Sequence, residues 1–344
     1  SDELKLRMAD CYAYMGNYEK ALIYIKKADR YKNDEIREAV SREIYEIYSL
    51  LGDYKNALAG YGKFIYDEKT NKSYSHITGY ADSLARCGDV EKAAWVLQKI
   101  SSHGDRMRET INLYQLCGHG EEAKRLLTEW TKEKSIRSAC ANLAGRIYMK
   151  KKYPQKYVEY CQYCARAAWQ EILFGGFTKK GIQKTWKLLD IASENNENIL
   201  GDAVFFAILT EDEQRGKRYA KRLGELLCKN NGRKAEEKYF KQQKKLIRLK
   251  ALSCWYQGED AVRKILGPFG ESQPGSAVYK VPAVCEHCSL CLCKELEILR
   301  ILLLLKGDKE DQELAKRLVE KNLKLQPMDE YLMALKNRSH LFIV

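Results

Sequence analysis

The phrase Gly52-Asp53-Tyr54-Lys55-Asn56-Ala57 decides how this chain folds, because four copies of its pattern occur in the first third of the sequence. The others are Gly16-Asn17-Tyr18-Glu19-Lys20-Ala21, Gly88-Asp89-Val90-Glu91-Lys92-Ala93 and Gly118-His119-Gly120-Glu121-Glu122-Ala123, with successive glycines 36, 36 and 30 residues apart. Glycine readily takes the left-handed backbone that ends a helix, and Asn or Asp after it is a common N-cap. Each phrase therefore predicts a helix, a tight turn and a second helix. The aromatic Tyr18 or Tyr54 is expected to fill the gap between the helices, and the alanine lets them approach closely.

Apolar or aromatic residues stand at fixed distances in sequence from these turns. Four residues before each glycine stand Tyr12, Tyr48, Leu84 and Tyr114, and nine residues after it stand Ile25, Tyr61, Leu97 and Leu127. Such fixed offsets predict the inner seam of each helical pair and its contact with the next pair.

A period of about 34 residues, built as helix, turn and helix, is typical of tetratricopeptide repeats. The chain resembles the tetratricopeptide repeat family over residues 1–173, and more loosely beyond. The resemblance implies an all-α fold, a right-handed α–α superhelix (a solenoid) of about seven to nine helical pairs. It also implies a non-enzymatic protein that binds other polypeptides.

Three segments are expected along the chain. Residues 1–173 form the regular array, 174–266 degenerate helical repeats with a basic stretch, and 267–344 a loop, a cysteine-rich segment and C-terminal capping helices. In the fifth pair the turn reads Lys151-Lys152-Tyr153-Pro154, where Tyr153 keeps the gap-filling position and Pro154 starts the second helix. A final helix over residues 329–341 is expected to cap the stack.

Composition favours a helical protein of the cytoplasm. Of 344 residues, 31% are charged and only 5 are proline. Twelve cysteines in a long helical chain favour small buried thiols in a reducing compartment over a disulfide scaffold. No secretory signal opens the sequence, and the most apolar run, 296–305, is too short to span a bilayer, so no membrane partner is expected.

The net charge of +13 is concentrated in one stretch. Residues 215–250 contain fourteen Lys and Arg against three Glu. This stretch could follow a phosphate backbone, but Tyr219, Tyr239 and Phe240 are helically spaced and are interpreted as packing residues. A solvated helix face is the favoured interpretation, with nucleic acid or an acidic partner as the alternative.

The resemblance also points to a ligand groove. Six residues before each turn glycine stand Asp10, Glu46, Asp82 and Asn112, at the family position that faces the concave groove. The same face is expected to carry Tyr14, Arg42, Arg86, Arg108 and Gln115. An acidic ladder there favours a basic or amine-bearing ligand. Polar groove residues that simply face water are the favoured alternative.

The segment Cys285-Glu286-His287-Cys288-Ser289-Leu290-Cys291-Leu292-Cys293 is the one candidate metal site. Cys285, Cys288, Cys291 and Cys293 could converge on zinc, although structural zinc sites usually use two ligand pairs separated by a longer loop. Buried thiols that pack beside Leu290 and Leu292 are favoured, and zinc remains the alternative. No other cofactor is expected.

No nucleophile, phosphate-loop or His-Glu metal motif occurs, so no catalytic residue is assigned. Arrays with a cysteine-rich segment and a capping repeat resemble the sensor regions of bacterial helix-turn-helix (XRE-type) transcription regulators. The chain begins inside a repeat helix, so DNA contact is expected only through a domain absent from it. A free-standing scaffold that joins proteins is the alternative. The expected partner is a protein or peptide, and a homodimer is a further option.

Overall fold

The computed structural model describes residues 2–14, 17–27, 44–45, 47–48, 53–66, 74–130, 139–175, 177–193, 196–231, 240–266, 292–325 and 328–339. Within these ranges the fold is all-α, as predicted, and no strand is present. No helix in this part of the chain is both long enough and apolar enough to cross a membrane.

The chain divides into two compact units, with the main boundary between Cys117 and Gly118. The three segments predicted above have their boundaries elsewhere and stay a prediction. The helices of the first unit are α1 (Asp2–Tyr14), α2 (Tyr18–Lys27), α4 (Tyr54–Tyr66), α5 (Tyr74–Arg86), α6 (Val90–Leu97) and α7 (His103–Leu116). In this unit α1 packs against α2, and α5 packs against α4, α6 and α7.

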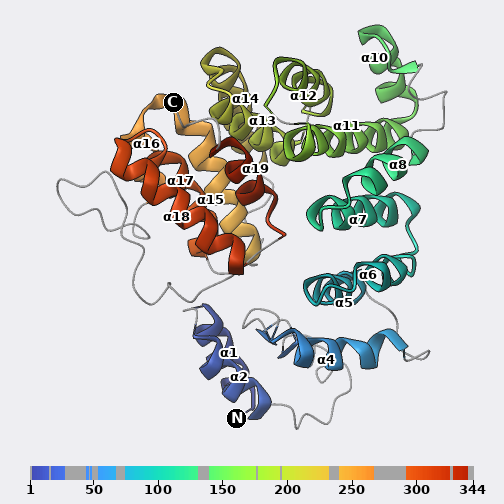
Figure 1. Cartoon of the computed structure of the whole chain (residues 1–344), viewed down its shortest axis with the longest axis vertical. Helices are drawn as coiled ribbons and strands as arrows, with labels where there is room; N and C mark the ends of the chain where they lie inside the picture. The colour runs from blue at the N-terminus through green and yellow to red at the C-terminus, as the bar shows by residue number, and fades with distance from the viewer. Residues whose placement is uncertain are drawn as a thin grey trace. The chain divides into compact units, whose positions relative to one another are not determined.

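The second unit holds the remaining helices, in whole or in greater part (Figure 1). They are α8 (Gly120–Trp130), α10 (Leu143–Lys152), α11 (Pro154–Phe174), α12 (Lys179–Ala192), α13 (Glu197–Leu209), α14 (Glu213–Asn231), α15 (Phe240–Cys254), the 3₁₀ turn η1 (Trp255–Gln257), α16 (Glu259–Leu266), α17 (Leu292–Leu304), α18 (Lys309–Leu325) and α19 (Glu330–Ser339). Its consecutive pairs α11/α12, α13/α14 and α15/α16 pack helix against helix.

The repeated turn has the geometry that its sequence predicts. Gly88 and Gly118 have φ values of 87° and 82°, in the left-handed region. Asp89 N–H donates to the Leu84 carbonyl, and Asp89 Oδ1 accepts from Lys92 N–H at 3.1 Å. The first bond closes α5 and the second caps α6, so five residues specify both helix ends. Gly16 and Gly52 lie outside the described residues.

Burial confirms the predicted seam after the turn, whereas of the four predicted positions before it only Leu84 is buried and Tyr12, Tyr48 and Tyr114 are half-buried. The four phrase alanines, Ala21, Ala57, Ala93 and Ala123, are all 0% exposed. The residues nine positions after the turn are buried as well: Ile25, Tyr61, Leu97 and Leu127. Because the alanines have no side chain beyond Cβ, the two helix backbones can approach closely at these positions.

Around α11 the prediction holds only in part. Pro154 takes the first position of α11, as expected, because its missing N–H has no partner to lose there. Tyr153 does not fill a gap between helices, because it is 44% exposed and its ring contacts only Tyr148 among the described rings. The aromatic core of this unit instead gathers Trp169, Phe205, Trp186 and Phe206.

Candidate functional site

Nine side chains are predicted to line a groove, and four of them cannot be placed. Arg42 and Glu46 lie outside the described residues. Asp10 and Tyr14 belong to α1, but the structure does not describe their side chains. The other five lie on α5 and α7 or at the end of α7: Asp82, Arg86, Arg108, Asn112 and Gln115. Gln115 is 0% exposed, so it is corrected from a groove residue to a packing residue.

Asp82 and Arg86 form a pair one helical turn apart on α5. Arg86 Nε donates to Asp82 Oδ2 at 2.8 Å, and Arg86 Nη1 reaches Tyr54 Oη on α4 at 3.4 Å. The thiol of Cys117 lies close to this pair, and burial raises its pKa to about 11, with the negative charge of Asp82 adding to the effect. The charge of Asp82 is thus balanced locally, which weakens the expected acidic ladder at this position.

Arg108 is held on three sides. Its guanidinium contacts Asp105 and Glu109, both at 3.0 Å, and Arg108 Nη2 donates to Tyr74 Oη at 2.8 Å. Tyr74 Oη donates in turn to Glu109 Oε1 at 2.6 Å. Burial, helped by Glu109, raises the pKa of Tyr74 to about 12. This network joins α5 to α7 and leaves a surface of mixed charge rather than an acidic one.

The cysteine-rich segment stays a prediction. Cys285, Cys288 and Cys291 lie outside the described residues, and the side chain of Cys293 at the start of α17 does as well. Among the residues that the structure does describe, no cluster of His, Cys, Asp or Glu could hold a metal ion. The eight cysteines in that part are free thiols, and Cys140 and Cys164 are buried.

The basic stretch is neutralised in part where it is described. On α14, Arg215 pairs with Asp212 at 2.8 Å, Lys217 with Glu213 at 2.7 Å and Arg218 with Asp190 at 3.0 Å. Tyr219 is 0% exposed, which confirms that it is a packing residue. The solvated helix face therefore remains the favoured interpretation of this stretch.

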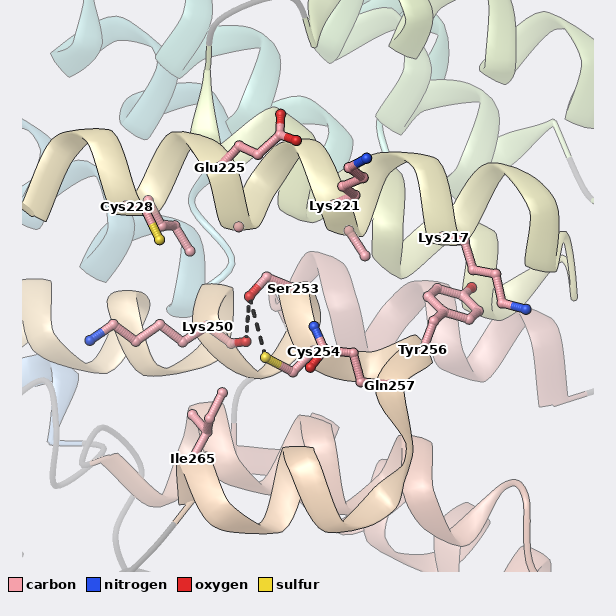
Figure 2. Close-up of a pocket in the computed structure, with 13 residues that line it drawn as sticks. Lys217, Lys221, Glu225, Cys228, Lys250, Ser253, Cys254, Tyr256, Gln257 and Ile265 are labelled. Atoms are coloured by element: carbon pink, nitrogen blue, oxygen red, sulfur yellow. Dashed lines mark hydrogen bonds between the residues drawn. The ribbon is translucent and has the colours of Figure 1, made fainter.

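A cleft of about 510 Å³ lies between α14, α15 with η1, and α16 (Figure 2). Cys228, Ser253 and Cys254 point into it, and Lys217 and Tyr256 stand together at one end. Ser253 Oγ donates to the Lys250 carbonyl at 2.7 Å. The described lining holds no histidine, and its one carboxylate, Glu225, points away from the thiols in Figure 2. The cleft offers space and mixed chemistry, and no arrangement of acid, base and nucleophile.

A further copy of the repeated turn joins α13 to α14, where the sequence pattern did not predict one. Glu211 has φ 57° in the glycine position, Asp212 N–H donates to the Ala207 carbonyl, and Asp212 Oδ1 accepts from Arg215 N–H at 3.1 Å. Gly216 replaces the buried alanine, where an added Cβ would overlap the Tyr256 ring. In the sequence, the only part of the repeated pattern kept at this turn is Asp212, an N-cap residue four positions before a small buried residue.

By the same register, one residue of α13 takes the position predicted for groove residues. Six residues before Glu211 stands Phe205 on α13, the counterpart of Asp82 and Asn112. The ring of Phe205 meets the ring of Tyr331 edge to face, with centroids 4.9 Å apart. The face of α13 that corresponds to the predicted groove is therefore in contact with α19.

α19 also contacts α11 and α15 (Figure 1). Arg166 Nη1 on α11 lies 2.7 Å from Glu330 Oε1, and these side chains are 16% and 17% exposed. Burial raises the pKa of Glu330, and the charge of Arg166 opposes that rise. From α15, the Arg248 guanidinium lies over the Tyr331 ring at 4.5 Å. A helix expected only to cap the array thus lies on residues 83 to 164 positions earlier.

No protein-family model matches the chain, and no curated protein is significantly similar to it in sequence.

Proposed function

We propose that this chain is a tetratricopeptide-type helical array that binds protein or peptide segments and performs no chemistry. In this proposal the helical pairs stack as a right-handed superhelix, and the first helices of the pairs form the ligand-binding face. The repeated turn supports the stacking, because Gly88, Gly118 and Glu211 fix the same backbone register in three pairs.

One observation carries the proposal: a helix of this chain, α19, already lies on the face that the register marks as the groove. On that face Tyr331 contacts Phe205, 126 residues earlier. Beside this contact Glu330 pairs with Arg166 on α11, 164 residues earlier. A surface that accepts one helix so far along the chain is suited to accept others. The proposal stops at polypeptide binding, since the described residues favour neither the transcription-regulator hypothesis nor the scaffold hypothesis.

The test is a selection from a displayed random-peptide library against the full chain, followed by affinity measurement. Selected peptides are expected to lose affinity when Asn112 on the first-helix face of α7 becomes Arg. They should keep it when Trp95, 51% exposed on the second helix α6, becomes Ala. A library that yields no binder, or only binders indifferent to the first helices of both units, contradicts the proposal.

A further inference from the structure

The side chains of α19 that contact α11 and α13 fall into two doublets seven residues apart. Glu330 and Asn337 contact Arg166 and the Leu173 carbonyl of α11. Tyr331 and Arg338 contact Asp202 and the Leu209 carbonyl of α13. The two partners on each helix are also seven residues apart, just under two helical turns. Equal spacing in the same order means that α19 runs parallel to both helices and contacts each of them at two levels.

At the second level α19 binds the carboxyl ends of the two helices. Asn337 Nδ2 donates to the Leu173 carbonyl at 2.8 Å, and Arg338 Nε donates to the Leu209 carbonyl at 2.6 Å. Both carbonyls lie in the last turn of their helix, where no intrahelical N–H is available. The positive charge of Arg338 also suits the negative end of the α13 dipole. The two carbonyls are thus bound by an amide and a cation, in that order along α19.

At the first level α19 presents a carboxylate and a phenol. Glu330 meets the buried guanidinium of Arg166, while Tyr331 Oη donates to Asp202 Oδ1 at 2.5 Å. Trp169 meets the Tyr331 ring edge-on with centroids 5.2 Å apart, and Trp169 Nε1 donates to Asp202 Oδ2 at 3.1 Å. Together with Phe205 and Arg248, these groups form a receptor for a tyrosine side chain preceded by an acid.

This set of contacts is directional, unlike the apolar packing that joins helices within a core. Leu332 and Leu335 supply buried apolar area, but every polar group of the two doublets has its own partner. Buried charges and unpaired carbonyls penalise any helix that lacks the matching group. The face therefore selects a sequence pattern and not merely an amphipathic helix.

We infer that α19 is an intramolecular ligand in a helix-binding site of α11, α13 and α15, and that this site takes a helix of a partner protein with the same pattern. The pattern is an acidic residue followed by tyrosine, then an amide followed by arginine seven positions later. The inference rests on the proposed function and specifies its ligand. Because α19 is tethered, its effective concentration is on the order of millimolar for a short connection, so a free helix competes only when α19 is weakened.

The experiment weakens α19 in the full chain and leaves the site intact. The double variant Glu330→Gln/Tyr331→Phe removes the charge and the phenol on α19, while Arg166, Asp202 and both carbonyls remain. Hydrogen exchange checks that α19 has become less protected. The probe is a fluorescein-labelled synthetic peptide of residues 328–339 with the native sequence, titrated by fluorescence anisotropy.

The double variant is expected to bind the probe roughly tenfold or more tightly than the unaltered chain, since charge-assisted hydrogen bonds are the strong ones. A peptide carrying the same two substitutions should lose roughly tenfold or more. A matched Lys336→Arg peptide, changed at an exposed position, should bind as the native one does. Adding Arg166→Met to the double variant should abolish the gain.

Two results overturn the inference: equal binding of native and doubly substituted peptides, or an α19 that stays fully protected in the double variant. Either result leaves the proposed function standing if the library yields peptides that depend on the first helices. Failure of the library selection, by contrast, removes the function itself.

Discussion

Replacing Glu330 by Gln is expected to weaken the docking of α19 by about 3 kcal/mol. The change keeps the size of the side chain and removes its charge, which leaves the Arg166 guanidinium buried without its closest counterion. Breaking a buried pair in this way costs about 3–5 kcal/mol. The lower end applies here, because each side chain is about one-sixth exposed and Asp202 also acts on Arg166.

Urea unfolding followed by circular dichroism gives the free energy, and hydrogen exchange of α19 amides shows whether the loss is local. The double substitution Arg166→Met/Glu330→Met should cost less than either single change, because no buried charge then remains. The matched control is Glu313→Gln, which removes an exposed carboxylate 2.6 Å from Lys316 and should leave stability unchanged within error. A cost below about 0.5 kcal/mol for Glu330→Gln, or a double variant as unstable as the sum of the singles, would refute this account of the pair.

Three other predictions address the turns, an ionisable network and a thiol. Gly88→Ala should lower the free energy of unfolding, measured in urea, by about 1–2 kcal/mol, because a φ of 87° is strained for any L side chain. No steric overlap contributes, since no atom lies within 4 Å of the added Cβ. An unchanged unfolding midpoint would contradict the left-handed turn. Tyr74 has its pKa raised from 10.0 to about 12, so the stability that this shift contributes is complete below pH 10 and is lost as the pH rises towards 12. Tyr74→Phe should therefore remove that part of the alkaline loss of stability. An identical alkaline stability profile in the variant would contradict the proposed shift. Because its pKa is raised to about 11, Cys117 should react with iodoacetamide at pH 8 more slowly than the exposed Cys87. Peptide mass spectrometry measures both alkylation rates, and equal rates would argue against the burial of Cys117.

The local parts of the fold could be predicted from the sequence because they depend on neighbours along the chain. A glycine, an N-cap and an alanine within six residues specify the turn at Gly88, the cap at Asp89 and the burial of Ala93. The turn at Glu211 escaped notice because a residue other than glycine holds the left-handed position and Gly216 holds the alanine position. A pattern search that relies on glycine fails where tertiary packing supports the strained backbone instead.

The candidate site was harder to predict, because it depends on contacts between distant segments. Asp82 looked like a free acid until Arg86 was found 2.8 Å away, and Gln115 looked exposed until its burial was known. Nothing local to residues 330–338 indicates that Arg166 and Asp202 are their partners, since the pairing appears only when four helices are placed in space.

The most direct test of the central claim, that the first helices form a polypeptide-binding face, is site-specific photo-crosslinking of a library-selected peptide. The photoreactive residue benzoylphenylalanine replaces Asn112 on the first helix α7 in one variant and the exposed Trp95 on the second helix α6 in another. The account predicts a crosslinked product from position 112 and none from position 95, with the product lost when unlabelled peptide is added in excess. Crosslinking from position 95 alone, or equally from both positions, would contradict it.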